Sequence, residues 1–258
     1  DTLSPARQET IALARLIQAK TDGNPFFVRA LLRSLYDQQL VTFDRAGNGW
    51  TWDAEEVSRA RLSDDIVDLL SARIGDLSDR TQTALEIGAC IGSSFTLALL
   101  ATVSSEDPVL VAKDLWEALQ RGLLRVVGDA YKYIDRLDPS ASGNESPPEI
   151  RYYFVHDKIQ HAAYIRLDPS RRRLTHLRIG RLLRDQTHPN ELGELVFRIT
   201  THLNASIALV TDRGERVRLA ELNLLAGRRA KRSIAYNSAV THLRTGIELL
   251  PEEQWESC

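Results

Sequence analysis

The 258-residue chain has no methionine, only two cysteines and no long apolar run. A helix needs about 18 or more consecutive apolar residues to cross a bilayer, so the sequence predicts no membrane segment. We also expect no signal peptide, because the first residues lack its apolar pattern. Cys90 lies in an apolar segment and Cys258 ends the sequence, which excludes a disulfide framework and favours a reducing cytoplasm. The chain begins at Asp1, and we expect it to be a piece of a longer protein.

The chain also lacks an excess of either charge. Its 33 Lys and Arg residues and 35 Asp and Glu residues give a formal net charge of −2. Nucleic-acid-binding domains usually carry a strongly basic face, so this balance argues against a general nucleic-acid binder. A hydrophobic fraction of 43% is ordinary for a globular protein with an apolar core. The length allows one large domain or two to three small ones.

Several catalytic signatures are absent from the sequence. No phosphate-binding loop of the form G-x-x-x-x-G-K-[ST] occurs, because the glycines of Gly88–Ser94 are followed by no lysine. There is no G-x-S-x-G turn and no kinase H-R-D or D-F-G motif. Five histidines show no metal-ligand spacing, and we expect surface or capping positions for them: His161, His176, His188, His202 and His242. The sequence therefore predicts no catalytic residues and no metal site in this chain, and leaves open whether its parent is an enzyme.

Residues 1–58 are expected to form a small helical segment that ends in a β-hairpin. Apolar residues at helical spacing predict one helix through Ile11 and Ile17. A second helix is expected to begin at Pro25, because a proline in the first turn loses no useful N–H group. Two β-prone runs, Leu40–Asp44 and Trp50–Asp53, flank a Gly-Asn turn and predict the hairpin.

Residues 59–168 have the element order of a winged-helix domain. A helix with an apolar stripe from Ile66 to Ile74 comes first. Further helices are predicted at about 81–91, 96–103 and 108–121, and they are followed by strands at 123–127 and 151–155. The polar segment 138–149 between the strands is predicted to be a mobile wing tip.

Residues 169–258 are predicted to be helical repeats. Helical periodicity covers 173–184, 191–204, 215–233 and 236–250. The last two helices resemble one tetratricopeptide unit, whose period is about 34 residues. Small residues such as Gly227 would allow them to pack closely, and we expect further repeats in the intact protein. The fold class predicted for the chain is mainly α.

Six segments together resemble one known family. They are GNPFF (23–27), the GWTWD hairpin, IVDLLSARIGDL, ALEIGACIGSSF, FVHDKIQHAAY (154–164) and LAELNLLAGRRAKRSIAY. In this order they are similar to the STAND class of signalling ATPases related to AAA proteins, in the branch found inside large hybrid serine/threonine and histidine kinases. The resemblance covers nearly the whole chain and implies a role in signal transduction and phosphorelay.

The resemblance implies roles for three residues. Pro25 would pack on the adenine ring of a bound nucleotide. His156 would donate a hydrogen bond to the β-phosphate of ADP, and Asp157 would orient the local backbone. Phe154-Val155 departs from the family's usual residues before the histidine.

The resemblance also implies a ligand, partners and a location. The implied cofactor is ATP or ADP, held together with a P-loop ATPase domain of the same parent chain that this sequence does not contain. The helical repeats would bind protein partners, and the protein would be cytoplasmic. The chain would then be the regulatory arm of an ATPase that senses nucleotide and signals to a linked protein kinase.

Two simpler interpretations remain open at this point. Without the resemblance, Pro25 is only the first residue of a helix. His156 is then a histidine at a strand end whose ring is satisfied by the backbone.

A winged helix also raises the alternative of a DNA-binding transcription regulator of the ATPase-activator type, with the helix 108–121 in the major groove. That helix offers Lys113 and Arg121 but also Asp114 and Glu117. Its acidic residues favour the signalling interpretation, and nucleic acid is not expected as a partner.

Overall fold

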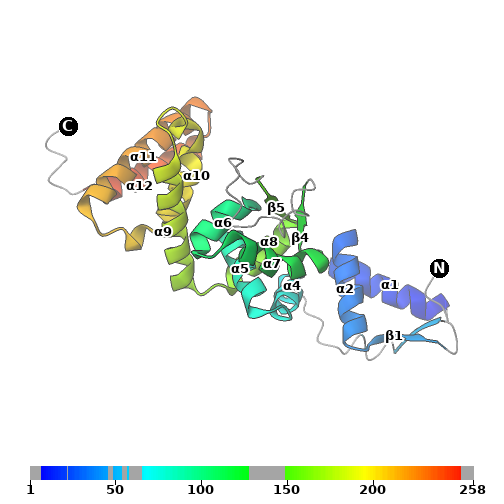
Figure 1. Cartoon of the computed structure of the whole chain (residues 1–258). Coiled ribbons are helices and arrows are strands. Elements are labelled where there is room, and N and C mark those ends of the chain that lie inside the picture. The colour runs from blue at the N-terminus through cyan, green and yellow to red at the C-terminus, as the bar shows by residue number, and fades with distance from the viewer. Residues whose placement is uncertain are drawn as a thin grey trace.

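The computed structural model describes residues 7–21, 23–45, 49–53, 57, 66–127 and 149–250. Within these residues helices dominate, and two small antiparallel sheets accompany them (Figure 1). The predicted mainly α fold class is therefore confirmed.

The described residues of the amino-terminal part (7–57) include the two helices and the hairpin that the sequence predicted. Helix α1 (Arg7–Thr21) and helix α2 (Pro25–Asp37) are separated by Gly23, whose φ of +72° suits a residue without a side chain. Strands β1 (Val41–Asp44) and β2 (Gly49–Trp52) pair antiparallel. Their core consists of buried apolar side chains: Leu13, Ile17, Leu31, Leu35, Val41 and Val57.

The described residues of the middle part (66–127 and 149–166) form five helices and one three-stranded sheet. In chain order they are α4 (Ile66–Gly75), α5 (Asp79–Ile91), β3 (Ser94–Thr96), α6 (Leu97–Ser104), α7 (Pro108–Gln120), β4 (Leu124–Val126), β5 (Arg151–Phe154) and α8 (Asp157–Arg166). The predicted helices and the two predicted strands are present, and β5 pairs antiparallel with β4. Residues 128–148 lie outside the described part, and with them nearly all of the predicted wing tip at 138–149.

Two elements of the middle part were not predicted. Strand β3 pairs with the other edge of β5, so that the strand order is β3-β5-β4. It has only three residues, which are too few to show a strand period. Helix α8 follows β5 after two residues. On the sheet, Phe95 of β3 stacks on the fully buried ring of Tyr152, with 5.7 Å between the ring centroids.

The carboxy-terminal part is built from paired helices. They are α9 (Pro169–Gln186), α10 (Leu192–Ala205), the 3₁₀ turn η2 (Ile207–Leu209), α11 (Arg213–Arg232) and α12 (Tyr236–Leu249). Helix α9 packs on α10, and α11 packs on α12 (Figure 1). The four predicted helices are thus confirmed. Helix α9 begins earlier than predicted because Asp168 caps it and Pro169 occupies its first turn.

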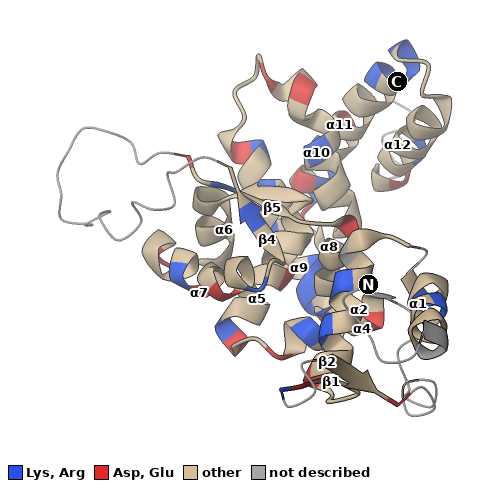
Figure 2. Ribbon diagram, turned by 90° about the vertical axis from the view of Figure 1, so that its right-hand side faces the viewer, with Lys and Arg blue, Asp and Glu red and all other residues tan. Residues whose placement is uncertain are grey.

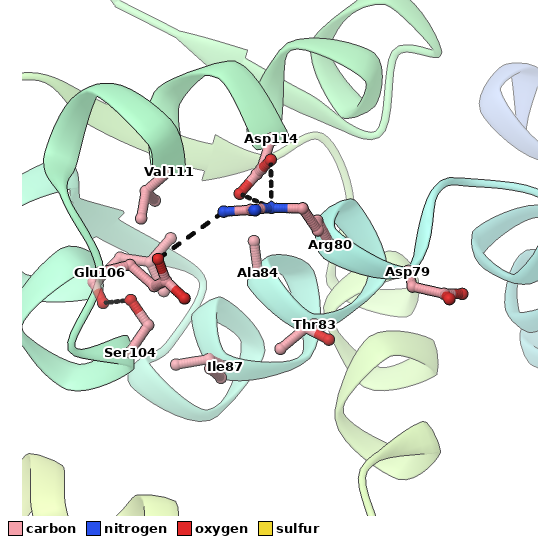
Figure 3. Close-up of a pocket in the computed structure, with 10 residues that line it drawn as sticks. Asp79, Arg80, Thr83, Ala84, Ile87, Ser104, Glu106, Val111 and Asp114 are labelled. Carbon is pink, nitrogen blue, oxygen red and sulfur yellow. Dashed lines mark hydrogen bonds and ion pairs between the residues drawn. The ribbon is translucent and has the colours of Figure 1, made fainter.

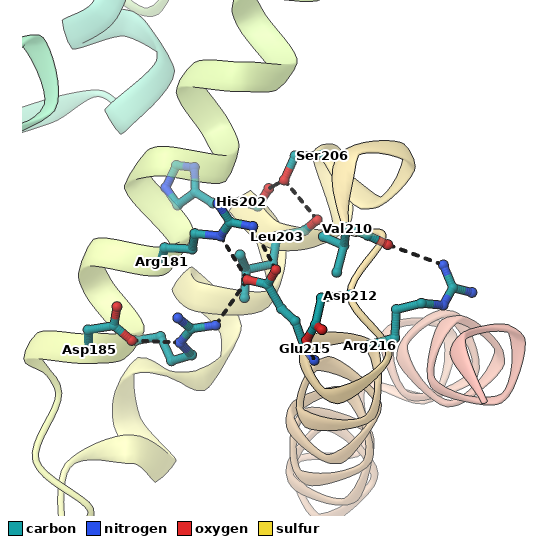
Figure 4. Close-up of polar contacts among 10 residues, drawn as sticks. Arg181, Asp185, His202, Leu203, Ser206, Val210, Asp212, Glu215 and Arg216 are labelled. Atoms are coloured by element: carbon teal, nitrogen blue, oxygen red, sulfur yellow. Dashed lines mark hydrogen bonds and ion pairs between the residues drawn. The ribbon is translucent and has the colours of Figure 1, made fainter. Parts of the chain in front are cut away.

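A buried carboxylate ties the last helix pair to α9. Glu215, at the start of α11, accepts hydrogen bonds from Arg181 Nε at 2.8 Å and from Arg184 at 3.2 Å (Figure 4). Its backbone N–H donates to the capping carboxylate of Asp212 at 2.7 Å. The hydrogen bond from Arg181 lowers the pKa of Glu215, against an opposing effect of burial. These contacts fix α11 relative to α9.

The expectation that all five histidines are surface or capping residues is wrong for two of them. His176 and His202 are only 7% and 4% exposed, and their Nδ1 atoms lie 2.9 Å apart between α9 and α10. The Tyr164 hydroxyl lies 3.1 Å from His176 Nε2. The three side chains form a hydrogen-bonded row, and helix packing, which sequence spacing does not reveal, brings them together.

Burial governs the charge of this histidine pair. It lowers the pKa of His202 to about 3, with further contributions from His176 and Arg198. Burial and Arg172 also lower the pKa of His176. Both rings are therefore neutral at pH 7. Of the other histidines, His188 accepts a hydrogen bond from the Asn190 N–H, as a capping residue does.

We predict that Gly227→Ala destabilises the chain. A Cβ atom at Gly227 would lie 2.7 Å from Leu243 Cγ on α12, which is too close for α11 and α12 to keep their spacing. The expected net loss in the free energy of unfolding is about 1–2 kcal/mol, since the clash outweighs the gain in helix propensity. Gly193→Ala is the control, because its nearest neighbour is the flexible end of Arg229. Chemical denaturation measures both, and equal stability of the two variants would contradict close packing at Gly227.

We also predict a pH dependence that comes from His202. Its pKa is about 3 in the folded chain and about 6.5 when unfolded, so the unfolded chain binds more protons between these values. Stability therefore falls as the pH drops below about 6.5, by up to about 1.4 kcal/mol per pH unit for this residue. His202→Gln should flatten the plot of unfolding free energy against pH, whereas the exposed control His161→Gln should not. Parallel plots for wild type and His202→Gln would refute this.

Candidate functional site

Two motifs that are far apart in the sequence meet in the structure. Phe27 from GNPFF lies against His156 from FVHD, with 4.7 Å between the ring centroids and 58° between the ring planes. Helix α2, which carries Phe27, also contacts α4. Phe27 is half-buried and packs against the core of the middle part. The junction between α2 and the start of α8 is therefore the candidate site.

The GNPFF motif sets the start of α2. Gly23 allows the left-handed turn after α1, and the Asn24 carbonyl accepts the first helical hydrogen bond, from the Val28 N–H at 2.9 Å. Pro25 is the first helical residue and is exposed. Because the helix starts here, Pro25 lies at its end and Phe27 turns toward His156.

The FVHD motif joins strand β5 to helix α8. His156 has an extended backbone, with φ −148° and ψ 148°, and is the N-cap of α8. Asp157 lies in the first turn of α8, where its negative charge interacts favourably with the positive end of the helix dipole. The His156 side chain is 28% exposed and that of Asp157 is 77% exposed.

His156 Nδ1 lies near one hydrogen-bond donor and one acceptor. It can bond to only one of them, depending on whether Nδ1 carries a proton. It lies 3.2 Å from the Lys158 N–H, and it also contacts Asp157 Oδ1. The Lys158 N–H is closer to Asp157 Oδ1, at 2.8 Å, and a carboxylate is the stronger acceptor. We therefore assign the proton to Nδ1, which donates to Asp157. This contact fixes the orientation of the imidazole ring.

A cavity of about 470 Å³ lies beside this junction. Pro25 and Ala30 of α2 form one part of its wall, and Gly122 and Val155 form another. Four arginines complete the lining: Arg29, Arg33, Arg73 and Arg121. Figure 2 shows Lys and Arg side by side with Asp and Glu over much of the chain, with basic residues where α2 and α4 lie together.

The arginines of this cavity affect one another. Burial lowers the pKa of Arg73, and the positive charges of Arg33 and Arg121 lower it further, whereas Asp37 and Asp76 oppose them. Arg73 also donates a hydrogen bond to the Arg121 carbonyl at 3.3 Å. The cavity is thus a region of concentrated positive charge.

Asp157 faces a second cavity, of about 510 Å³, together with Cys90, His176 and His202. Burial raises the pKa of the Cys90 thiol to about 12, so this thiol is not a nucleophile at neutral pH. The neutral histidines and this thiol give the second cavity no evident chemistry. Pro25 therefore lines the first cavity and Asp157 lines the second, whereas His156 lines neither and contacts Phe27 beside the first.

A third cavity, of about 290 Å³, lies between α5, α6 and α7 (Figure 3). Arg80 crosses it, with Nε 3.1 Å from both Asp114 carboxylate oxygens and a guanidinium nitrogen 3.7 Å from Glu106. Glu117 of the same α7 helix accepts a hydrogen bond from the Ser78 N–H at 3.0 Å. Helix α7 therefore presents carboxylates that are held in place by α5 and its cap.

The junction contains residues that the sequence singled out and residues that it did not. Pro25 and His156 were predicted as binding residues; Pro25 lines the first cavity, and His156 contacts Phe27. The four arginines were missed as a group. Helical spacing could have paired Arg29 with Arg33, but only the fold brings Arg73 and Arg121 beside them.

In the part of the chain that the structure describes, no group of three or more His, Cys, Asp or Glu side chains could hold a metal ion. Nor does any helix there have the length and apolar character needed to cross a membrane.

Comparisons with known proteins find similarity to one signalling kinase. Over 281 aligned residues the chain is 30% identical to the hybrid signal transduction histidine kinase G of Dictyostelium discoideum. The match covers 96% of this chain but only 8% of the kinase. No family model matches the chain, and no solved structure matches it. Nearly the whole chain is therefore similar to one small part of a large signal transduction kinase.

Proposed function

We propose that this chain is the regulatory arm of a STAND-type signalling ATPase, which senses bound nucleotide and relays its state to a linked protein kinase. One observation carries the proposal: the GNPFF and FVHD motifs meet through Phe27 and His156, beside a cavity that Pro25 lines. The similarity to a hybrid signal transduction histidine kinase supports the signalling part.

Three features of the junction support an adenine nucleotide as its ligand. Pro25 offers a flat apolar ring, and the cavity has the size of ordinary small-molecule sites, about 300–1,000 Å³. His156, oriented by Asp157, would donate a hydrogen bond to a phosphate oxygen through Nε2 when the ring is protonated. A P-loop domain of the same parent chain would hold the rest of the nucleotide, because this sequence has no such loop.

The signal would travel along continuous structure. His156 caps α8, α8 packs on α4 and α5, and α9 follows α8 after two residues and contacts α5. A shift of the His156 turn would therefore move α8 and α9 together. The helices α9–α12 would pass this change to protein partners, in the cytoplasm, through their repeat surfaces.

The alternative of a DNA-binding regulator is less well supported. Its recognition helix would be α7, whose Asp114 and Glu117 are held in place by bonds to the α5 segment. Carboxylates at a phosphate-facing helix repel the DNA backbone.

We predict that His156→Ala, placed in the longer parent protein with its P-loop domain, speeds ADP release about tenfold or more and raises basal signalling. The reason is the loss of one charge-assisted hydrogen bond to the phosphate. Release of a fluorescent ADP analogue and kinase output would be measured side by side. The control is His161→Ala, an exposed histidine on α8. An ADP release rate equal to that of wild type would contradict a role of His156 in sensing the nucleotide.

A further inference from the structure

The arginine-lined cavity gathers charge from three separate segments. Arg29 and Arg33 stand four residues apart on α2 and so lie on one face of that helix. Arg73 comes from the last turn of α4, and Arg121 comes from the turn after α7. None of the described residues that line the cavity carries a carboxylate.

Nearby carboxylates offset this charge only in part. Glu117 lies 3.5 Å from Arg121, and Asp37 and Asp76 act on Arg73. Among the described residues, Arg29 and Arg33 form no ion pair.

Like charges that lie close together destabilise the arrangement that brings them together, unless an anion lies between them. The same cations that repel one another would therefore favour a ligand with several negative charges.

The residues that line the cavity indicate which class of anion it would bind. Guanidinium groups match phosphate oxygens with paired hydrogen bonds, and several of them together suit a ligand with more than one phosphate. Pro25, Ala30 and Val155 add an apolar wall, which a bare inorganic ion would not use.

We propose that this cavity binds a diphosphate group, with Arg29 and Arg33 on one side and Arg73 and Arg121 on the other. The bound diphosphate connects α2 to α4 and to the turn after α7, and so holds α2 against the middle part of the chain. The arginine site does not require the P-loop domain. That the diphosphate belongs to a nucleotide rests on the proposed function above.

The test is a calorimetric titration of the 258-residue chain with inorganic pyrophosphate at low ionic strength. The double variant Arg29→Gln/Arg33→Gln should weaken binding about tenfold or more, and Arg29→Lys/Arg33→Lys should keep part of it. Both arginines are exposed, so circular dichroism should show an unchanged fold. The control is Arg218→Gln/Arg228→Gln on α11, which removes the same charge from exposed positions.

Sulfate, ADP and adenosine are titrated into the same chain as comparison ligands. Pyrophosphate binding that is no tighter than sulfate binding, or that survives Arg29→Gln/Arg33→Gln, would overturn the proposal. Tighter binding of ADP than of pyrophosphate would support the site with a nucleotide as the source. Equal binding of the two would support it with the diphosphate group alone.

The proposal and the proposed function fail in different experiments. Pyrophosphate binding to the 258-residue chain tests the arginines without the P-loop domain, whereas ADP release from the longer parent protein tests His156.

Discussion

The contact between the rings of Phe27 and His156 holds the amino-terminal helices against the middle part of the chain. It joins helix α2 to the turn that starts α8. The contact exists because Gly23 permits a left-handed turn and Pro25 begins α2, so that Phe27 faces the middle part. On the other side, Asp157 holds the His156 ring in one orientation. Two short motifs thereby become one structural unit.

Packing stabilises the position of α2 at this junction, whereas electrostatic repulsion destabilises it. The aromatic contact and the burial of Phe27 hold α2 in place, whereas the four arginines beside them repel one another. A balance of this kind responds to a bound anion, since an anion removes the repulsion without changing the packing. The same arrangement suits a sensor, because the ligand then decides how firmly α2 is held. Helix α8 begins directly after His156, and α9 follows α8 after two residues.

Much of the fold could be predicted from the sequence, because local signals fix it. Apolar periodicity located the helices, and the Gly-Asn turn located the hairpin of β1 and β2. The three-residue strand β3 shows no period, and α8 begins with a histidine cap rather than with a common capping residue. For the site, the resemblance supplied Pro25 and His156. Tertiary packing brings Phe27 to His156 and Arg33 to Arg73. Local sequence patterns do not reveal contacts of this kind.

The central claim is that Phe27 and His156 stabilise the docking of α2 together. Native-state hydrogen exchange of the α2 amides, measured for wild type, Phe27→Leu, His156→Gln and the double variant, tests it most directly. We expect a coupling free energy of about 0.5–1.5 kcal/mol between the two positions, as is usual for a ring pair in contact. Additive effects of the two substitutions, with no coupling, would contradict it.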